Sequence, residues 1–536
     1  MPVETTFGID LGTTHSCIAS VDEAGKAVVI RNSLGEETTP SVVYFEPGKR
    51  VTVGTSAKHA AVLTPHLVAQ LTKRLIGVSD VAGTYHGQTY SPEEVGALIL
   101  RELVRSVREN TGQRVEDVVI TVPAYFGVAQ KEATRQAGKI AGLRVLDVLP
   151  EPVAAALHYQ TLHTGTGVRH LLVCDLGGGT FDTSVIRLDG DDVRTVCTGG
   201  DGRLGGADWD QRVRAHLLSC FTEEHPDLDP TRDEAFLQDL ATIAEKLKKD
   251  LSSAEARRAA LRFGGAVTRV ELTRAKLEEL TADLLDRVVD VTEQTVATAK
   301  AQGVPSFDDV ILVGGMAKMP AVADRLERKL GLRGRLHEPE VAVAKGAALY
   351  AVLRRVQDGA TAHRVADQLG LSTDQVESLA TKKVTGVVPK AFGVMAVDAS
   401  DPLALTDPLR ARKMIAHLLP ANTPLPADSG PFPFAVAVDK QRMVEIEVWE
   451  QAGEFESEEL SENVRIGRGR LRNLPPRPAG SPFEVTFFMS ETGTLTVHAI
   501  EPASGAEVRF DLQIGGMDAA AVQKARTDIA RHEVQG

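Results

Sequence analysis

Two segments of this chain repeat one local pattern. In each, an apolar strand ends at an acidic residue, a Leu-Gly turn follows, and a second apolar strand begins, at residues 7–19 and again at 172–185. Strands alternating with helices follow each copy, which predicts an α/β fold of two related halves with a sheet at the centre of each. We call residues 11–14 the first glycine turn and residues 177–180 the second glycine turn.

The segments around these turns have clear hydrophobic periodicities. Apolar residues at helical spacing and short apolar runs bounded by Gly and Pro set the expected elements. We expect helices near 95–104, at 128–142, from 154 onward, at 242–251 and at 274–302, and strands at 118–122, 145–149 and 310–313.

The pattern changes after about residue 355. A helix–Gly–helix segment at 363–381 precedes short alternating strands between turn residues, so we expect a compact antiparallel β-domain at 390–515 and one helix at most within 519–534. The local sequence pattern of this helix pair also resembles a DNA-binding helix-turn-helix motif. A linker helix pair is the better interpretation, because a third helix is missing and the chain is acidic.

The charge balance excludes several classes of partner. Sixty Lys and Arg face 73 Asp and Glu, a formal net charge of −13, which disfavours non-specific binding to nucleic acids and anionic membranes. The four cysteines form no CxxC pair, the first residues carry no secretory signal, and no apolar run approaches the roughly 20 residues of a membrane helix. We therefore expect a cytoplasmic protein.

The two glycine turns suggest a phosphate-binding cleft. Glycine lets backbone N–H groups wrap phosphate oxygens closely, and Asp10 and Asp175, which head the turns, could hold Mg²⁺. A plain β-turn is the alternative for each turn alone, and the repetition favours phosphate binding. Glu151 could stabilise a helix dipole or orient water in the cleft. A basic pair such as Lys73-Arg74 is usually a solvated surface feature, but a γ-phosphate role stays open.

A set of motifs carries a resemblance to a known family. The motifs are Asp-Leu-Gly-Thr-Thr at 10–14, Lys-Arg-Leu-Ile-Gly at 73–77, Thr-Val-Pro-Ala-Tyr-Phe at 121–126, Glu-Pro at 151–152, Asp-Leu-Gly-Gly-Gly-Thr-Phe-Asp at 175–182, Leu-Gly-Gly at 204–206 and Val-Gly-Gly at 313–315. In this order they resemble the nucleotide-binding domain of the seventy-kilodalton heat-shock chaperones (DnaK-like) over about residues 5–355.

The resemblance implies an actin-like ATPase fold whose two lobes close on Mg²⁺-ATP, with ADP as product and K⁺ as a further cation. Lys73 would assist γ-phosphate transfer, with Glu151 and Asp175 positioning the attacking water and Thr180 completing the catalytic set. The metal carboxylates would be Asp10, Asp175 and Asp182. The nucleotide-binding residues that it implies are Asp10, Gly12, Thr13, Thr14, His15, Gly178, Gly179, Asp182, Glu245, Lys248, Ser252, Gly314, Gly315 and Lys318.

The later segments are similar to the family's peptide-binding β-sandwich. The similar segments are Phe-Gly-Val-Met at 392–395, 419–426, 441–446, 483–487 and 493–497. Such a domain holds an extended peptide by backbone hydrogen bonds and an apolar pocket. The residues that would line the pocket are Val394, Val397, Phe434, Ala437 and Val444, with ordinary sandwich core as the alternative for each.

The chain also departs from the family pattern. The segment between Gly77 and Ser91 is shorter than the corresponding segment of the family. Val128 stands where the family usually has an acidic residue, and Met316 where it usually has a serine. A longer segment than the family linker, 357–383, separates the two domains. Only 20 residues follow Gly516, too few for a helical lid bundle, so we expect fast peptide exchange.

We therefore expect four units: an actin-like ATPase domain at 1–355, a helical linker at 356–389, a β-sandwich at 390–516 and a helical tail at 517–536. The leading hypothesis is an ATP-hydrolysing chaperone that binds extended apolar peptides, with a J-domain co-chaperone as a further partner. One rival is a nucleotide-dependent regulatory module without client release. A sugar or acetate kinase is a third possible class. The similarity of the later segments to a peptide-binding domain argues against it.

Overall fold

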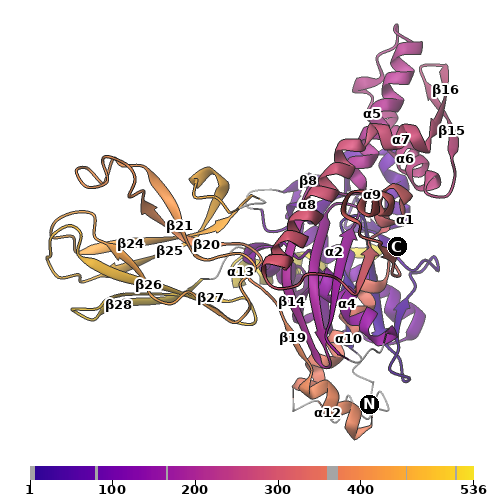
Figure 1. Cartoon of the computed structure of the whole chain (residues 1–536). Coiled ribbons are helices and arrows are strands. Elements are labelled where there is room, and N and C mark those ends of the chain that lie inside the picture. Colours follow the sequence, from indigo (N-terminus) through magenta and orange to yellow (C-terminus); the bar gives the residue numbers. More distant parts are fainter. Residues whose placement is uncertain are drawn as a thin grey trace.

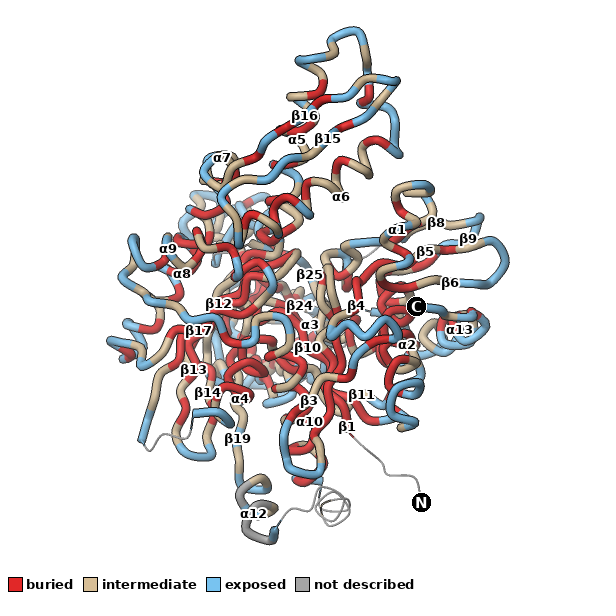
Figure 2. The backbone as a smooth tube through the Cα atoms, turned by 90° about the vertical axis from the view of Figure 1, so that its right-hand side faces the viewer, coloured by how far each residue is buried: buried red, intermediate tan, exposed pale blue. Residues whose placement is uncertain are grey.

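The computed structural model describes residues 6–536 apart from 79–81, 164–166, 359–361, 363–371, 454–455 and 513–515. An α/β part forms two lobes, and an elongated antiparallel β-part projects from one side of it (Figure 1). Buried residues concentrate in the strands of both lobes (Figure 2). The expected fold class is confirmed.

Lobe I is built on a sheet in which the strand order is β11-β10-β1-β2-β3, with β4 paired to β2. Phe7 and Ile9 pack with the apolar residues of α2 and α3, whereas Gly8 faces α10 so closely that a Cβ would be 2.0 Å from Ala348 N. Both faces of this sheet are therefore covered by helices. Its elements are β1 (Thr6–Asp10), β2 (His15–Val21), β3 (Ala27–Ile30), β4 (Thr39–Pro40), α2 (Pro92–Thr111), β10 (Asp117–Val122), α3 (Val128–Ile140), β11 (Arg144–Pro150) and α10 (Ala342–Gln357).

A smaller sheet of lobe I has the order β29-β6-β5-β7, and it lies near the short hairpin β8–β9. The elements of this region are β5 (Val43–Phe45), β6 (Arg50–Val53), α1 (Thr55–Leu63), η1 (Pro65–Leu67), β7 (Val68–Ala69), η2 (Thr72–Leu75), β8 (Gly83–Tyr85), β9 (Gln88–Tyr90) and β29 (Glu533–Gln535).

Lobe II repeats the sheet design with the order β18-β17-β12-β13-β14-β19. Its elements are α4 (Glu151–Leu162), β12 (Arg169–Leu176), β13 (Phe181–Asp189), β14 (Asp192–Asp201), α5 (Gly206–Glu224), η3 (Pro230–Arg232), α6 (Glu234–Leu251), β15 (Ala256–Phe263), β16 (Ala266–Thr273), α7 (Arg274–Leu280), α8 (Ala282–Ala301), β17 (Asp309–Val313), η4 (Gly315–Lys318), α9 (Pro320–Leu330), β18 (Arg335–Leu336) and β19 (Lys383–Thr385).

The two lobes share one strand arrangement around their glycine turns. β1 pairs antiparallel with β2 and parallel with β10, and β12 pairs antiparallel with β13 and parallel with β17. Each turn therefore connects a central hairpin at the same edge of its sheet, as the internal repeat predicts.

The β-domain consists of two packed antiparallel sheets, with strand orders β21-β20-β24-β25 and β22-β26-β27-β28, and with β23 paired to β26. An apolar core lies between them and includes Phe392, Val448 and Phe487. The elements are β20 (Phe392–Val397), β21 (Lys413–Leu419), β22 (Ala427–Asp428), β23 (Phe432–Ala435), β24 (Met443–Gln451), η5 (Leu460–Glu462), β25 (Asn463–Arg472), β26 (Pro482–Met489), β27 (Leu495–Glu501) and β28 (Ala506–Leu512).

The segment between the two domains enters the sheet of lobe II. Helix α12 (Thr373–Thr381) precedes β19, which pairs in parallel with β14, so that Val384 lies opposite Val193. The first helix expected at 363–371 lies outside the described residues.

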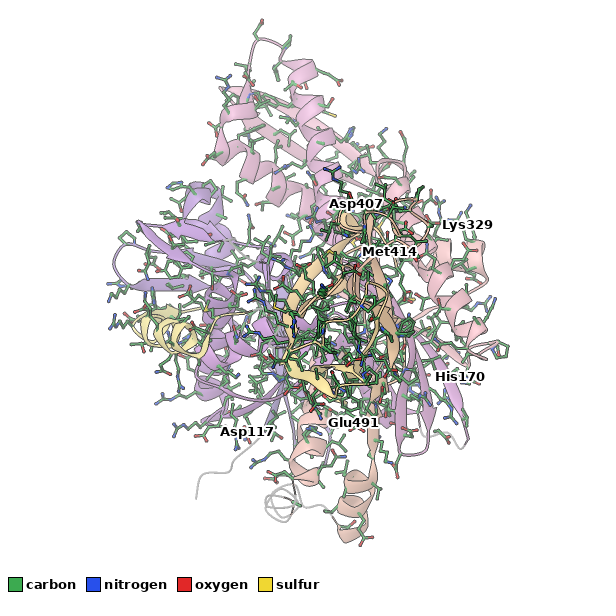
Figure 3. All side chains as sticks on the ribbon, turned by 90° about the vertical axis from the view of Figure 1, so that its left-hand side faces the viewer. Asp117, His170, Lys329, Asp407, Met414 and Glu491 are labelled. Atoms are coloured by element: carbon green, nitrogen blue, oxygen red, sulfur yellow. The ribbon has the colours of Figure 1, made fainter. Side chains whose placement is uncertain are left out.

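The last segment returns to lobe I. Helix α13 (Ala519–Ala530) lies against lobe I beside the β-domain (Figure 3), and Ala525 and Ile529 are buried in the lobe I core. The expected helix over 519–534 is too long, because β29 follows it and pairs in parallel with β6. The Tyr90 hydroxyl lies 2.9 Å from His532 Nε2.

The other expected elements are present, and several of them differ in extent. The expected helix over 242–251 is the C-terminal part of α6, which begins at Glu234. The helix expected over 274–302 is broken at Thr281, whose hydroxyl donates to the Leu277 carbonyl, so that α7 and α8 form separate helices. Helix α4 begins at Glu151 rather than at residue 154.

Candidate functional site

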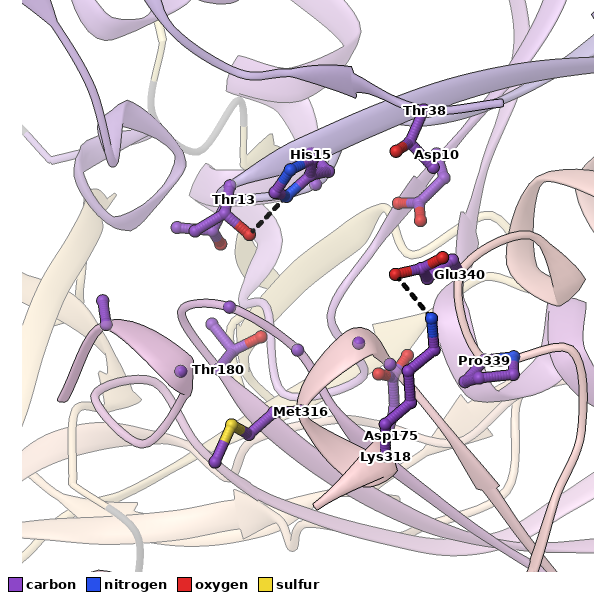
Figure 4. Close-up of a pocket in the computed structure, with 18 of the residues that line it drawn as sticks. Asp10, Thr13, His15, Thr38, Asp175, Thr180, Met316, Lys318, Pro339 and Glu340 are labelled. Carbon is purple, nitrogen blue, oxygen red and sulfur yellow. Dashed lines mark hydrogen bonds and ion pairs between the residues drawn. The ribbon is translucent and has the colours of Figure 1, made fainter. Parts of the chain in front are cut away.

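A cavity of about 360 Å³ lies between the two lobes, and both glycine turns reach it. In the close-up (Figure 4), Asp10 and Asp175 lie on opposite sides of the cavity. His15 directly follows the first glycine turn, and Thr180 is the last residue of the second. The cavity is therefore assembled from the repeated halves of the chain.

The two glycine turns pack directly on each other. A Cβ at Gly178 would be 2.0 Å from Thr14 Oγ1, and a Cβ at Gly179 would be 2.3 Å from Thr13 Cγ2. This approach requires residues without a side chain in the second glycine turn. The first turn is held by Ser16, whose hydroxyl accepts a hydrogen bond of 3.1 Å from the Gly12 amide.

Lys73 and Glu151 form an ion pair inside the cleft. Lys73 Nζ lies 2.5 Å from Glu151 Oε1, and the two side chains are 6% and 8% exposed. Lys73 comes from η2 of lobe I, whereas Glu151 is the first residue of α4. A basic side chain that sequence patterns usually place in solvent is thus buried at the centre of the site.

Carboxylates outnumber cations around this pair. Burial raises the pKa of Asp10 to about 7, and the neighbouring Glu151 adds to the effect. Burial and Glu151 also raise the pKa values of Asp175 and Asp182 well above their usual range. Burial alone would lower the pKa of Lys73, but Glu151 and Asp10 outweigh it, and the pKa is raised. The centre therefore favours an added cation.

Asp182 supports this interpretation. Its Oδ1 accepts hydrogen bonds of 2.7 and 3.4 Å from the amides of Ala124 and Tyr125, while its Oδ2 is buried and lacks a partner among the described residues. A buried oxygen without a partner is costly unless a cation or ordered water compensates it.

Within the described parts of the chain, no group of three or more His, Cys, Asp or Glu side chains forms a ready-made metal site. Mg²⁺ keeps several waters and usually binds through one or two carboxylates and substrate phosphates. Two carboxylates that line the cavity, those of Asp10 and Asp175, therefore fit such a cation.

Charged residues of α6 line the far side of the cavity. Burial alone would raise the pKa of Glu245, but Lys58 and Lys249 lower it to about 2, and Lys58 Nζ lies 2.5 Å from the carboxylate. Lys248 Nζ donates to the Gly206 carbonyl at 2.8 Å and pairs with Asp210 at 2.7 Å. The α6 residues that the family resemblance assigns to nucleotide binding, Glu245 and Lys248, thus face the cavity with their charges already paired.

His15 and Lys318 complete the rim. Burial, with Lys249 and Lys58, lowers the pKa of His15 to about 4, so its imidazole is neutral at pH 7. Lys318 Nζ lies 2.8 Å from Glu340 Oε1. Figure 4 marks this ion pair with a dashed line.

Most of the predicted site residues line this one cavity. They are Asp10, Gly12, Thr13, Thr14, His15, Lys73, Glu151, Asp175, Gly178, Thr180, Glu245, Lys248, Ser252, Gly314, Gly315 and Lys318. Gly179, within the second glycine turn, packs against Thr13, and Asp182 is fully buried. Sequence reasoning did not single out several lining residues, because they carry no local motif: Thr38, Ala207, Asp210, Lys249, Pro339, Glu340 and Val343.

The residues predicted to line a peptide pocket lie in the β-domain. Val394 is 4% exposed and belongs to the sandwich core, which is the alternative that its sequence context left open. Val397 and Ala437 are half-buried. Phe434 and Val444 are half-buried and pack at the edge of the core, where the Phe434 ring lies 5.9 Å from the Phe483 ring.

Two lobes of shared topology around a cleft with two glycine turns, followed by a β-sandwich, define a two-lobed nucleotide-binding protein of the actin-like class. None of the helices that the structure describes is long and apolar enough to cross a membrane. The family profile described as Hsp70 protein matches residues 6–390 and 393–535. The chain therefore belongs to the Hsp70 family, whose members bind nucleotide and are ATPases.

Proposed function

We propose that this chain is an ATP-dependent chaperone, cytoplasmic in its location, that hydrolyses ATP in the cleft and binds extended apolar peptides in the β-domain. The observation that carries the enzymatic half is the buried Lys73–Glu151 pair beside Asp10 and Asp175, at the point where the two glycine turns meet. The proposed units are 1–355, 356–389, 390–516 and 517–536.

Transfer of the γ-phosphoryl group to water needs positioning and charge neutralisation more than a covalent nucleophile. In this proposal Glu151 and Asp175 orient the attacking water, and the ammonium of Lys73 stabilises charge on the transferred group. The Thr180 hydroxyl and the amides of the turns hold the phosphates. Mg²⁺ near Asp10, with K⁺ as a further cation, would neutralise phosphate charge.

The peptide half of the proposal rests on the β-domain. Val397, Phe434, Ala437 and Val444 keep partly exposed apolar surface, which suits an apolar side chain of an extended segment. The partners in this proposal are unfolded polypeptides and a J-domain co-chaperone.

Contacts between the domains support coupling of the two halves. The linker strand β19 extends the sheet that carries the second glycine turn. The Asn422 side chain accepts a hydrogen bond of 2.8 Å from the Thr198 amide of lobe II. Peptide binding and nucleotide binding therefore have a physical route by which each can change the affinity of the other.

A regulatory module without client release is the second candidate. Residues 516–536 favour it, because Ile529 is buried in the lobe I core and thereby connects the C-terminal end of the β-domain to the ATPase domain. The linker strand β19 already connects the two domains, and this second connection through Ile529 restricts their separation.

Peptide dissociation separates the two candidates. A fluorescent extended apolar peptide is bound to the full chain, and its dissociation rate is measured with Mg²⁺-ATP and with Mg²⁺-ADP. A chaperone predicts release about tenfold faster with ATP, because a coupling free energy links the sites. Equal rates favour the regulatory module, and absence of peptide binding contradicts the chaperone proposal.

A further inference from the structure

Arg74 crosses the cleft from lobe I to lobe II. Its guanidinium donates to the Gly179 carbonyl from Nε at 2.9 Å and from Nη2 at 2.6 Å. It also pairs with Asp208 of α5 at 2.5 Å, and both side chains are about four-fifths buried, at 19% and 20% exposed. Arg74 follows Lys73 in the same short turn, so one element supplies both the buried cation of the cleft and this bridge.

Three successive carbonyls of the second glycine turn are held by hydrogen bonds from the start of α5 and from Arg74. The Gly206 amide donates to the Gly177 carbonyl at 3.0 Å, and the Ala207 amide donates to the Gly178 carbonyl at 2.8 Å. Arg74 holds the third carbonyl, that of Gly179. Two of these ties lie within lobe II, and the third comes from lobe I.

The direction of these carbonyls fixes the direction of the amides. In a planar trans peptide, the C=O of one residue and the N–H of the next point in opposite directions. Because Gly206, Ala207 and Arg74 hold these carbonyls, the amides of residues 178–180 point away from those three groups, and no described residue accepts a hydrogen bond from them. Such a run of free amides is a nest for an anion.

We infer that Arg74 is a positioning residue that completes the phosphate-binding geometry of the second glycine turn when the two lobes close. The inference rests on the proposed function for its ligand, the phosphates of ATP. The bridge makes the orientation of the Thr180 amide depend on lobe I. Asp208 shares this role, because its Oδ2 accepts from the Gly205 amide at 2.8 Å while it pairs with Arg74.

The test compares Arg74→Ala with Arg74→Lys and with a matched control, Arg31→Ala. Arg31 also donates to a glycine carbonyl, that of Gly35, and to a carboxylate, that of Glu37, but both partners lie on the surface of lobe I. Melting curves verify that each variant folds, and Arg74→Lys serves if Arg74→Ala does not.

Two measurements are made on the full chain. Hydrogen exchange of the Gly177, Gly206 and Ala207 amides, without nucleotide, reports the order of the turn itself. Exchange in Arg74→Ala is expected to rise about fivefold, with Arg74→Lys between it and the wild type. KM for Mg²⁺-ATP is expected to rise about tenfold with kcat little changed, because the amides bind ground and transition states alike.

Each outcome decides a separate question. Exchange and KM equal to those of Arg31→Ala would overturn the inference. A raised KM with unchanged exchange would also overturn it, because Arg74 would then touch the nucleotide directly. Raised exchange in a protein that binds no Mg²⁺-ATP would support the positioning role and contradict the proposed function.

Discussion

Glu450 of the β-domain accepts a hydrogen bond of 3.2 Å from the backbone N–H of Val128, the first residue of helix α3 in lobe I. A carboxylate at this place complements the helix dipole. Val128 itself carries no charge, and the β-domain supplies a carboxylate to this helix start from a distant part of the chain. Helix α3 follows the loop whose Ala124 amide donates to Asp182. The Glu450 contact is therefore made to an element that is directly connected to the cleft.

Replacing Glu450 tests this contact. Glu450→Ala leaves the α3 amide without its carboxylate, and we expect a loss of about 1 kcal/mol of docking free energy. X-ray scattering should then give a larger radius of gyration. Glu447→Ala is the matched control, because Glu447 lies on the same strand and pairs with Arg465 at the surface. Equal radii for the two variants would refute a docking role for Glu450.

Lys73 and Thr180 test the catalytic assignment. Lys73→Ala and Thr180→Ala should lower single-turnover hydrolysis by at least about 100-fold, because each removes stabilisation of the transferred phosphoryl group. ATP binding should stay measurable by calorimetry. Lys26→Ala, on the exposed surface, is the control for loss of a positive charge. Hydrolysis like that of the wild type in both variants would refute the assignment.

Val444 tests the peptide pocket. Val444 is half-buried opposite Leu471, and a phenylalanine there would fill space that a peptide side chain needs. We expect Val444→Phe to weaken peptide binding about tenfold without a change in basal hydrolysis. The neighbouring Met443 points to the other face of the strand, so Met443→Phe is the control. An unchanged binding isotherm for Val444→Phe would remove Val444 from the pocket.

His532 makes docking of the last segment depend on pH. Burial lowers the pKa of His532, and Arg101 and Lys49 add to this. The native state therefore favours neutral imidazole, so its contribution to stability is complete above the usual pKa of about 6.5 and is lost as pH falls below it. Hydrogen exchange of residues 519–535, corrected for intrinsic rates, should rise between pH 7.5 and pH 5.5.

The matched variant for this prediction is His532→Gln, which can still hydrogen-bond to the Tyr90 hydroxyl but does not titrate. Its exchange over the same residues should be nearly independent of pH. A pH dependence equal to that of the wild type would place the titrating group elsewhere.

Local patterns predict much of the fold and of the cleft. The repeated turns identify Asp10 and Asp175 because strand, acidic residue and glycine are adjacent in the chain. The β29–β6 pairing, the Arg74 bridge and the Glu450 contact escape prediction, because each joins segments more than 100 residues apart by geometry that no local pattern encodes. Burial of Lys73 also reverses the usual expectation for a basic pair, since Glu151 compensates its charge.

Single-turnover hydrolysis of ATP by the full chain, with and without a saturating extended apolar peptide, tests the central claim most directly. Coupling between the cleft and the β-domain predicts faster hydrolysis when peptide is bound, and loss of that stimulation in Glu450→Ala. Hydrolysis that is indifferent to bound peptide would contradict an ATP-dependent chaperone and leave a nucleotide-dependent regulatory module as the better account.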